Sequence, residues 1–186
     1  ILPVLAAIPP AAVVAWQFLL DDDKKARILA VLNPALADPA ITWQQQRGLI
    51  AIGNGGVWGN GIFMETGQFR YVPEVYNDFI FTYIGETVGF IGCIAVLAAL
   101  AFLCIKILHN AKRAQDDLGT YICVGVFAMM AIQIIINIGM CLSMLPVIGV
   151  TLPFLSAGGT STGTLYLGIG VVLSVYVHSG KDRLFG

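Results

Sequence analysis

Residues 79–108 read FIFTYIGETVGFIGCIAVLAALAFLCIKIL, and Glu86 and Lys106 are the only charged residues among them. A helix crosses the hydrocarbon core of a bilayer with about 20 residues, so this run is long enough to span a membrane. A spanning segment must pair its backbone N–H and C=O groups internally, because lipid offers them no partners. The run therefore predicts a transmembrane α-helix.

The rest of the chain has the composition of a membrane protein. Of its 186 residues, 58% are hydrophobic and 11% are charged, whereas soluble domains average roughly 45–50% and about 25%. Strands of about ten alternating residues, which build membrane barrels, do not occur in the sequence. We therefore predict an all-α integral membrane protein. The net charge of −1 gives no reason to expect a nucleic-acid partner.

Four apolar runs predict a polytopic helical bundle, with spans at residues 1–20, 79–108, 121–145 and 161–179. Pro9 and Pro10 interrupt the first run, which predicts a kinked span. The chain begins inside this run, so we expect it to be the C-terminal part of a longer protein.

Basic residues predict which side of the membrane each segment faces, because short cytoplasmic loops are enriched in Lys and Arg. Five basic residues lie in or beside the link 110–117 and the C-terminal tail: Lys106, Lys112, Arg113, Lys181 and Arg183. The link and the C-terminus are therefore predicted to be cytoplasmic. The long loop 21–78 and the turn 146–160 then face the outside.

The outer loop contains a glycine-rich segment, IAIGNGGVWGNGIF, at residues 50–63. Its spacing fits neither the dinucleotide fingerprint nor the P-loop. Glycine permits tight turns and close approach of the backbone, so we expect this segment to lie against another part of the protein. Trp58 and Phe63, whose side chains favour the membrane interface, also suggest a re-entrant segment.

No metal site is predicted from the cysteines. Cys93, Cys104, Cys123 and Cys141 all lie inside apolar runs and show no C-x-x-C spacing. This pattern predicts buried thiols rather than disulfides or metal ligands.

Asp78 precedes the apolar run directly. A carboxylate at the outer end of a span is partly desolvated, and desolvation raises the pKa of a carboxyl group and makes it a better general base near neutral pH. The alternative is a helix N-cap, because Asp at this position pairs free backbone N–H groups. Both roles can coexist only if one carboxylate oxygen stays free.

Further polar residues lie within the apolar runs. On one continuous helix, Glu86 would lie about 12 Å beyond Asp78 and deeper in the bilayer. Ionisable residues there face a cavity or a partner, and the alternative is a hydrogen-bonded structural glutamate. Gln133 and Asn137 are spaced i, i+4 and share a helix face, which favours interhelical hydrogen bonds over substrate contact.

The segment LPVIGVTLPFLSAGGTSTG at residues 145–163 predicts irregular backbone between two spans. Such backbone is tolerated at membrane depth only where protein or a watery cavity surrounds it. The hydroxyl groups of Ser156, Thr160 and Ser161 could cap the following helix or bind a ligand.

Together these segments resemble the SEDS family, which comprises RodA, FtsW and their sporulation relatives. The resemblance rests on P-E-x-x-x-D-F-I-F at 73–81, G-E-x-x-G-F-I-G at 85–92, I-N-I-G at 136–139 and L-P-x-x-G-x-x-L-P-F-x-S-x-G-G-x-S at 145–161. It covers nearly the whole chain. The S-A-G-G-T-S turn at 156–161 leans toward the elongation-type RodA branch.

SEDS proteins are bacterial inner-membrane glycosyltransferases of about ten spans. They polymerise lipid II into peptidoglycan for cell shape, elongation and division, usually beside a class B penicillin-binding protein. The resemblance implies that this chain supplies the last four spans and is inactive alone. A lipid II flippase and a scaffold for a penicillin-binding protein remain the alternative functions.

The resemblance also implies that Asp78 is the catalytic carboxylate. Asp78 would accept a proton from the acceptor's C4 hydroxyl, which attacks the donor's anomeric carbon while undecaprenyl pyrophosphate leaves with inversion. Cations would stabilise the leaving group, and the candidates are Arg47, Arg70 and Lys24. Glu74, Glu86 and Ser156 are the other candidates for substrate binding. Pyrophosphate binds hard divalent cations, so a divalent cation is the one cofactor we consider.

Three residues depart from the family pattern without removing the expected base. Asn77 replaces the usual threonine before Asp78, Asn60 replaces a common lysine in the glycine-rich loop, and Thr87 replaces a second glutamate after Glu86.

Overall fold

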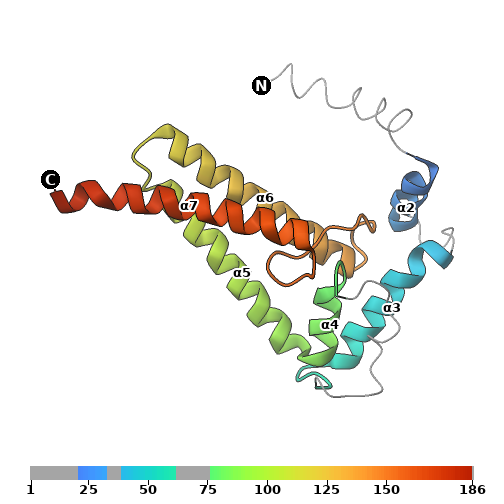
Figure 1. The fold of residues 1–186 in the computed structure, drawn as a ribbon. Coiled ribbons are helices and arrows are strands. Elements are labelled where there is room, and N and C mark those ends of the chain that lie inside the picture. The colour runs from blue at the N-terminus through green and yellow to red at the C-terminus, as the bar shows by residue number, and fades with distance from the viewer. Residues whose placement is uncertain (1–20, 33–38, 62–75, 186) are drawn as a thin grey trace.

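The structure, a computed structural model, describes residues 21–32, 39–61 and 76–185. The predicted first span, 1–20, lies outside these residues. Helices are the only regular secondary structure in the described part of the chain: α2 (Asp22–Leu32), α3 (Pro39–Gly55), α4 (Ile80–Thr87), α5 (Gly89–Ala111), α6 (Asp117–Cys141) and α7 (Gly159–Phe185). This confirms the predicted all-α class (Figure 1).

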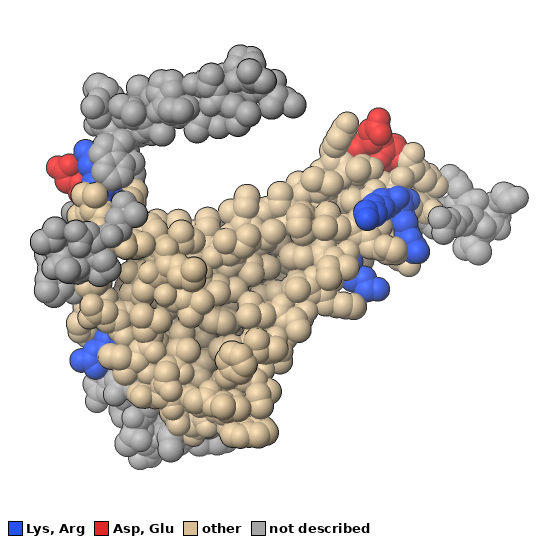
Figure 2. All heavy atoms as spheres, turned by 180° about the vertical axis from the view of Figure 1, so that it is seen from behind, with Lys and Arg blue, Asp and Glu red and all other residues tan. Residues whose placement is uncertain are grey.

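Within the described residues, three helices are long and apolar enough to cross a membrane: Gly89–Ala111, Asp117–Cys141 and Gly159–Ser179. They overlap the three predicted spans that fall in the described part. Their outer faces expose large apolar side chains such as Ile105, Ile135 and Leu167, as lipid-facing helices do. Figure 2 shows a broad face without charge, with charged side chains gathered at its edges.

The stretch 79–108, predicted as one span, is two helices. α4 ends at Thr87 and α5 begins at Gly89. Phe81 and Leu100 belong to one buried cluster, although a single straight helix would separate them by about 28 Å. α4 and α5 therefore form a V (Figure 1), and the prediction of one continuous helix was wrong.

Gly89 provides the physical reason for this reversal. Its φ is +75°, in the left-handed region that glycine adopts without steric penalty. A Cβ atom built there would lie 2.7 Å from Val57 O and 2.8 Å from Trp58 C. The corner between α4 and α5 thus needs a residue without a side chain.

The glycine-rich segment packs its backbone against this corner. Its main-chain hydrogen bonds to the corner include Asn60 N–H to Glu86 O (2.9 Å), Gly61 N–H to Thr87 O (2.9 Å) and Phe90 N–H to Gly56 O (2.9 Å). The predicted close backbone approach is confirmed. Whether the segment is re-entrant in the membrane stays a prediction.

The three long helices enclose a buried cluster that contains Cys104 and Ile107 of α5, Cys123 and Met130 of α6, and Leu165 and Val172 of α7. A second cluster joins α4 and α5 to the C-terminal end of α6, through Phe81, Cys93, Met140 and Cys141. All four cysteines are free and buried, as predicted. The second cluster supports the candidate site.

Candidate functional site

Asp78 lies in the turn 76–79, directly before α4. The N-cap residue of α4 is Phe79, and no side-chain capping bond is made there. Asp78 precedes this N-cap residue by one position, and the capping role of its carboxylate stays a prediction. Its side chain is half-buried.

Two other segments meet the Asp78 turn, namely the C-terminal part of α6 and the loop 142–158 that follows it. Asn137 of α6 donates from Nδ2 to Asp78 O at 2.8 Å and to Val150 O at 2.7 Å. Ala157 N–H donates to Tyr76 O at 2.9 Å. The turn is thus bonded to a helix and a loop that follow it by 59 residues or more.

Gly149 brings the loop close to the carboxylate itself. Its φ is +71°, and a Cβ atom built on it would lie 3.3 Å from Asp78 Oδ2. Glycine therefore leaves room for the carboxylate beside the loop backbone. This position belongs to the 145–161 motif of the sequence resemblance.

α3 anchors the start of the same loop through Gln45. Its Nε2 donates to Met140 O at 3.1 Å and to Leu145 O at 2.7 Å, and the side chain is only 5% exposed. Sequence reasoning missed Gln45. Its spacing from Thr42 and Gly48, both also buried, could have identified a buried face of α3 by helical periodicity.

Glu86 lies at the opposite end of α4 from Asp78, beside the corner with α5. Its side chain is 1% exposed, and its carbonyl accepts a hydrogen bond from Asn60 N–H at 2.9 Å. The reversal at Gly89 comes after Glu86, so Glu86 still lies along α4 from Asp78. Its depth in the bilayer stays a prediction. Its complete burial between packed backbones favours the structural alternative.

The predicted cations occupy different elements. Arg47 lies on α3, with its guanidinium carbon 5.5 Å from the centroid of the Trp43 ring, a cation–π contact. α3 packs against α4, since a Cβ atom built on Gly48 would lie 3.3 Å from Thr82 Oγ1. Lys24 is exposed on α2.

Ser156 is buried inside the loop. Its Oγ accepts a hydrogen bond from Leu152 N–H at 2.8 Å, and its own N–H donates to Leu152 O at 3.1 Å. This reciprocal pair fixes the loop, so the geometry favours a structural role. Arg70 and Glu74 lie outside the described residues and stay predictions.

No group of three or more His, Cys, Asp or Glu side chains that could hold a metal ion occurs among the residues that the structure describes. The described donors therefore identify no divalent-cation site.

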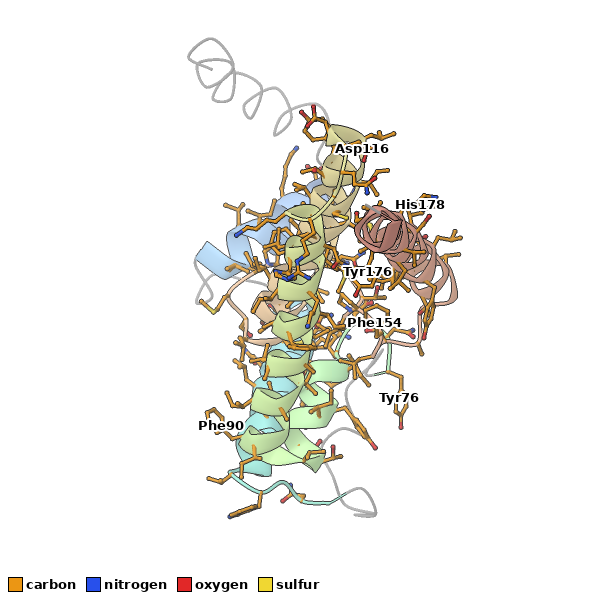
Figure 3. All side chains as sticks on the ribbon, turned by 90° about the vertical axis from the view of Figure 1, so that its left-hand side faces the viewer. Tyr76, Phe90, Asp116, Phe154, Tyr176 and His178 are labelled. Atoms are coloured by element: carbon orange, nitrogen blue, oxygen red, sulfur yellow. The ribbon has the colours of Figure 1, made fainter. Side chains whose placement is uncertain are left out.

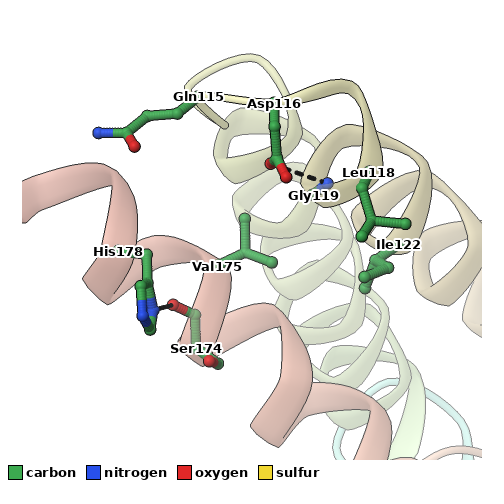
Figure 4. Close-up of a pocket in the computed structure, with 8 residues that line it drawn as sticks. All are labelled: Gln115, Asp116, Leu118, Gly119, Ile122, Ser174, Val175 and His178. Carbon is green, nitrogen blue, oxygen red and sulfur yellow. Dashed lines mark hydrogen bonds between the residues drawn. The ribbon is translucent and has the colours of Figure 1, made fainter.

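The opposite end of α6 holds a cavity of about 360 Å³. Asp116 and His178 face it from α6 and α7 (Figure 4) and lie far from Phe90 (Figure 3). Asp116 Oδ1 accepts from Gly119 N–H at 3.1 Å, and His178 Nδ1 lies 3.0 Å from Ser174 O. These exposed groups complete local helix bonds and are not part of the candidate site.

The described fold is that of a polytopic helical membrane protein with a half-buried carboxylate fixed where helix ends and an irregular loop meet. The chain belongs to the family of cell cycle proteins that includes FtsW, RodA and SpoVE, whose model matches residues 1–181. The SEDS resemblance is thereby confirmed.

Curated relatives carry names from all three branches. Stage V sporulation protein E of Bacillus subtilis (strain 168) is 39% identical over 153 residues, which are 82% of this chain and 42% of that protein. Peptidoglycan glycosyltransferase MrdB of Escherichia coli (strain K12) is 34% identical over 166 residues, 89% of this chain and 45% of that protein. A probable peptidoglycan glycosyltransferase FtsW of Thioalkalivibrio sp. (strain K90mix) is 39% identical, over 81% of this chain and 38% of that protein. The RodA branch stays a prediction.

The fold also matches a solved structure. A chain from the structure described as "Structural coordination of polymerization and crosslinking by a peptidoglycan synthase complex" aligns with a TM-score of 0.70 and 25% identity. The match covers 97% of this chain and 48% of that chain. The chain thus spans less than half the length of each of these relatives.

Proposed function

We propose that the protein is a peptidoglycan glycosyltransferase that polymerises lipid II, with Asp78 as its general base. The observation that carries the proposal is the position of Asp78 in a turn held by Asn137 and facing Gly149. Family membership and the names of MrdB and FtsW supply the reaction class.

The Asp78 carboxylate accepts the proton of the acceptor sugar's C4 hydroxyl as that oxygen attacks the donor's anomeric carbon. The bond between this carbon and the pyrophosphate oxygen breaks, and undecaprenyl pyrophosphate leaves with the electron pair. Attack opposite the leaving group inverts the anomeric centre and gives a β-1,4 linkage. A general base of this kind contributes about 10²–10⁴-fold to the rate.

Cations would offset the charge of the leaving pyrophosphate. Arg47 is the described candidate that we favour, because α3 packs directly on the helix that follows Asp78. Arg70, Glu74 and Lys24 remain further candidates for substrate contact. A divalent cation could supply the same stabilisation, and no step of the proposal depends on it.

The proposed partners are lipid II, the surrounding lipid and a class B penicillin-binding protein. The matched solved structure is described as a complex that coordinates polymerisation and crosslinking, which supports a partner of the crosslinking kind. We further propose a location in the bacterial inner membrane, with the link 112–116 and the C-terminus in the cytoplasm. Basic residues on the link, Lys112 and Arg113, favour this orientation.

The test is glycan strand formation from purified lipid II by the full-length protein with its partner. Asp78→Asn keeps the size of the side chain and removes the base, so we expect activity to fall by about 10²–10⁴-fold. Asp117→Asn is the matched control, because Asp117 is exposed at the other end of α6. It should keep full activity.

Polymerisation by Asp78→Asn at the normal rate would refute the assignment. A flippase would instead move lipid II across liposomes without polymerisation. A scaffold would bind its partner with no dependence on Asp78.

A further inference from the structure

The side-chain amide of Asn137 is a completely buried polar group that bonds to the Asp78 turn. It is 0% exposed, and both of its N–H groups are used, on Asp78 O and Val150 O. We propose that Asn137 is a positioning residue that sets the place of the Asp78 carboxylate against the loop 142–158. This inference rests on the proposed function and names a residue that acts on the base without touching substrate.

The two acceptors of Asn137 belong to two different segments of the chain. Asp78 O lies in the turn before α4, and Val150 O lies in the loop after α6. One NH₂ group therefore links the turn to the loop close to Asp78, in addition to the bond from Ala157 N–H to Tyr76 O at 2.9 Å. Complete burial leaves no water to replace a lost donor.

Gly149 couples the distance between the turn and the loop to the surroundings of the Asp78 carboxylate. It is the neighbour of Val150 in sequence, and the Cβ position on it lies 3.3 Å from Asp78 Oδ2. Movement of Val150 relative to Asp78 would therefore change the surroundings of the carboxylate oxygen. Misplacement by about 1 Å can lower a rate by as much as about 10²-fold.

No conservative replacement reproduces this arrangement. Asp at position 137 has no N–H donor and would place a buried charge beside two carbonyls. Leu has the same branched heavy-atom skeleton, a larger volume and no polar atoms. Asn137→Leu is therefore the cleaner probe, because it removes both donors and, besides them, only the weak contact of Oδ1 with Cys141 Sγ.

Gln45 offers a matched control. Like Asn137 it is a buried amide whose NH₂ group bridges two main-chain carbonyls, those of Met140 and Leu145. Neither of these carbonyls belongs to the Asp78 turn. Gln45 holds the start of the loop at Leu145 and not the residues beside Asp78, so Gln45→Leu should reproduce the loss of stability with a much smaller effect on the position of the carboxylate.

The experiment measures kcat and KM for lipid II, together with the melting temperature, on the full-length protein with its partner. We expect Asn137→Leu to lower kcat by about 10–100-fold with KM changed less than about twofold. We expect Gln45→Leu to lower the melting temperature by a similar amount and kcat by less than about threefold. If Asn137→Leu does not accumulate, Asn137→Ser, whose smaller side chain lowers the risk of misfolding, takes its place and should give the same separation of kcat from KM.

The outcomes separate this inference from the proposed function. Asn137 variants that keep normal kcat, or that lose kcat only as much as Gln45→Leu does, would overturn the positioning role. If Asp78→Asn is inactive in the same experiment, the assignment of Asp78 as the general base still stands. An active Asp78→Asn would overturn the proposed function itself.

Discussion

At the end of the bundle that carries Asp78, the buried amides of Asn137 and Gln45 bond across long stretches of sequence, whereas at the opposite end the exposed side chains of Asp116 and His178 bond within one turn of helix. Asn137 and Asp78 are 59 residues apart, and Gln45 and Met140 are 95 residues apart. The bond of Asp116 spans 3 residues and that of His178 spans 4. Of these four bonds, only the two at the first end join elements far apart in the sequence.

The comparison shows that a cavity alone does not identify a site in this protein. The cavity of about 360 Å³ lies at the end with local bonds. The hydrogen bonds of Asp116 and His178 there would also form in an isolated helix. The candidate site is defined instead by long-range bonds that hold the Asp78 turn and the loop beside it. Changes at the two ends should accordingly differ in what they affect.

The largest effect on stability is expected from Gly89→Ala. The new Cβ atom would overlap main-chain atoms of residues 57–59, and φ of +75° adds strain for alanine. Because backbone cannot move aside as a side chain can, we expect a loss of about 3 kcal/mol or more in the free energy of unfolding. Denaturant unfolding of the purified protein measures it.

Gly53→Ala is the control for Gly89, because nothing lies within 4 Å of the Cβ position at Gly53 on α3. Alanine should be neutral there or stabilise by about 0.5–1 kcal/mol. Equal losses in the two variants would show that the corner is not the constraint that places α4.

Gly149→Ala should have the next effect, and it should appear in activity more than in stability. Alanine at φ +71° costs about 1–2 kcal/mol, and its Cβ atom would lie 3.3 Å from Asp78 Oδ2. We expect polymerisation of lipid II to fall by about tenfold. Gly163→Ala on α7, where nothing lies within 4 Å, should leave activity unchanged.

These glycines mark the limit of what the sequence could predict. Hydropathy predicted membrane helices correctly, because composition alone decides burial in lipid. It could not predict the reversal at Gly89, since the residues on both sides of that glycine are apolar and the decisive contacts come from residues 57–59. Family motifs identified Asp78 as a candidate.

Sequence spacing was only partly informative about Asn137. Its i, i+4 relation to Gln133 predicted a hydrogen-bonding face, and Asn137 does form hydrogen bonds, although to a turn and a loop rather than to a neighbouring helix. The partners are backbone carbonyls, which every residue carries. No side-chain pattern can therefore predict which of them will be chosen.

A smaller effect is expected at the opposite end, from Asp116→Ala. Asp116 is the N-cap of α6 and its carboxylate accepts from Gly119 N–H. Loss of a cap costs about 1 kcal/mol, and polymerisation should stay within about twofold of normal. Asp116→Asn keeps a capping oxygen and should restore the stability. If Asp116→Ala lost more activity than the loss of folded protein explains, the functional site would have to include this end of the bundle.

The smallest effect is expected from Gln133→Leu, one helical turn from Asn137 on the same face. In the described part of the chain, Gln133 Oε1 is buried without a hydrogen-bond partner. Its removal therefore eliminates the desolvation cost of an unpaired polar atom. Stability should be unchanged or rise by up to about 1 kcal/mol, with normal activity. The measurement is the melting temperature and the polymerisation rate of Gln133→Leu and Asn137→Leu side by side. If Gln133→Leu reduced kcat as strongly as Asn137→Leu, the shared helix face, and not the bond to Asp78, would govern the site.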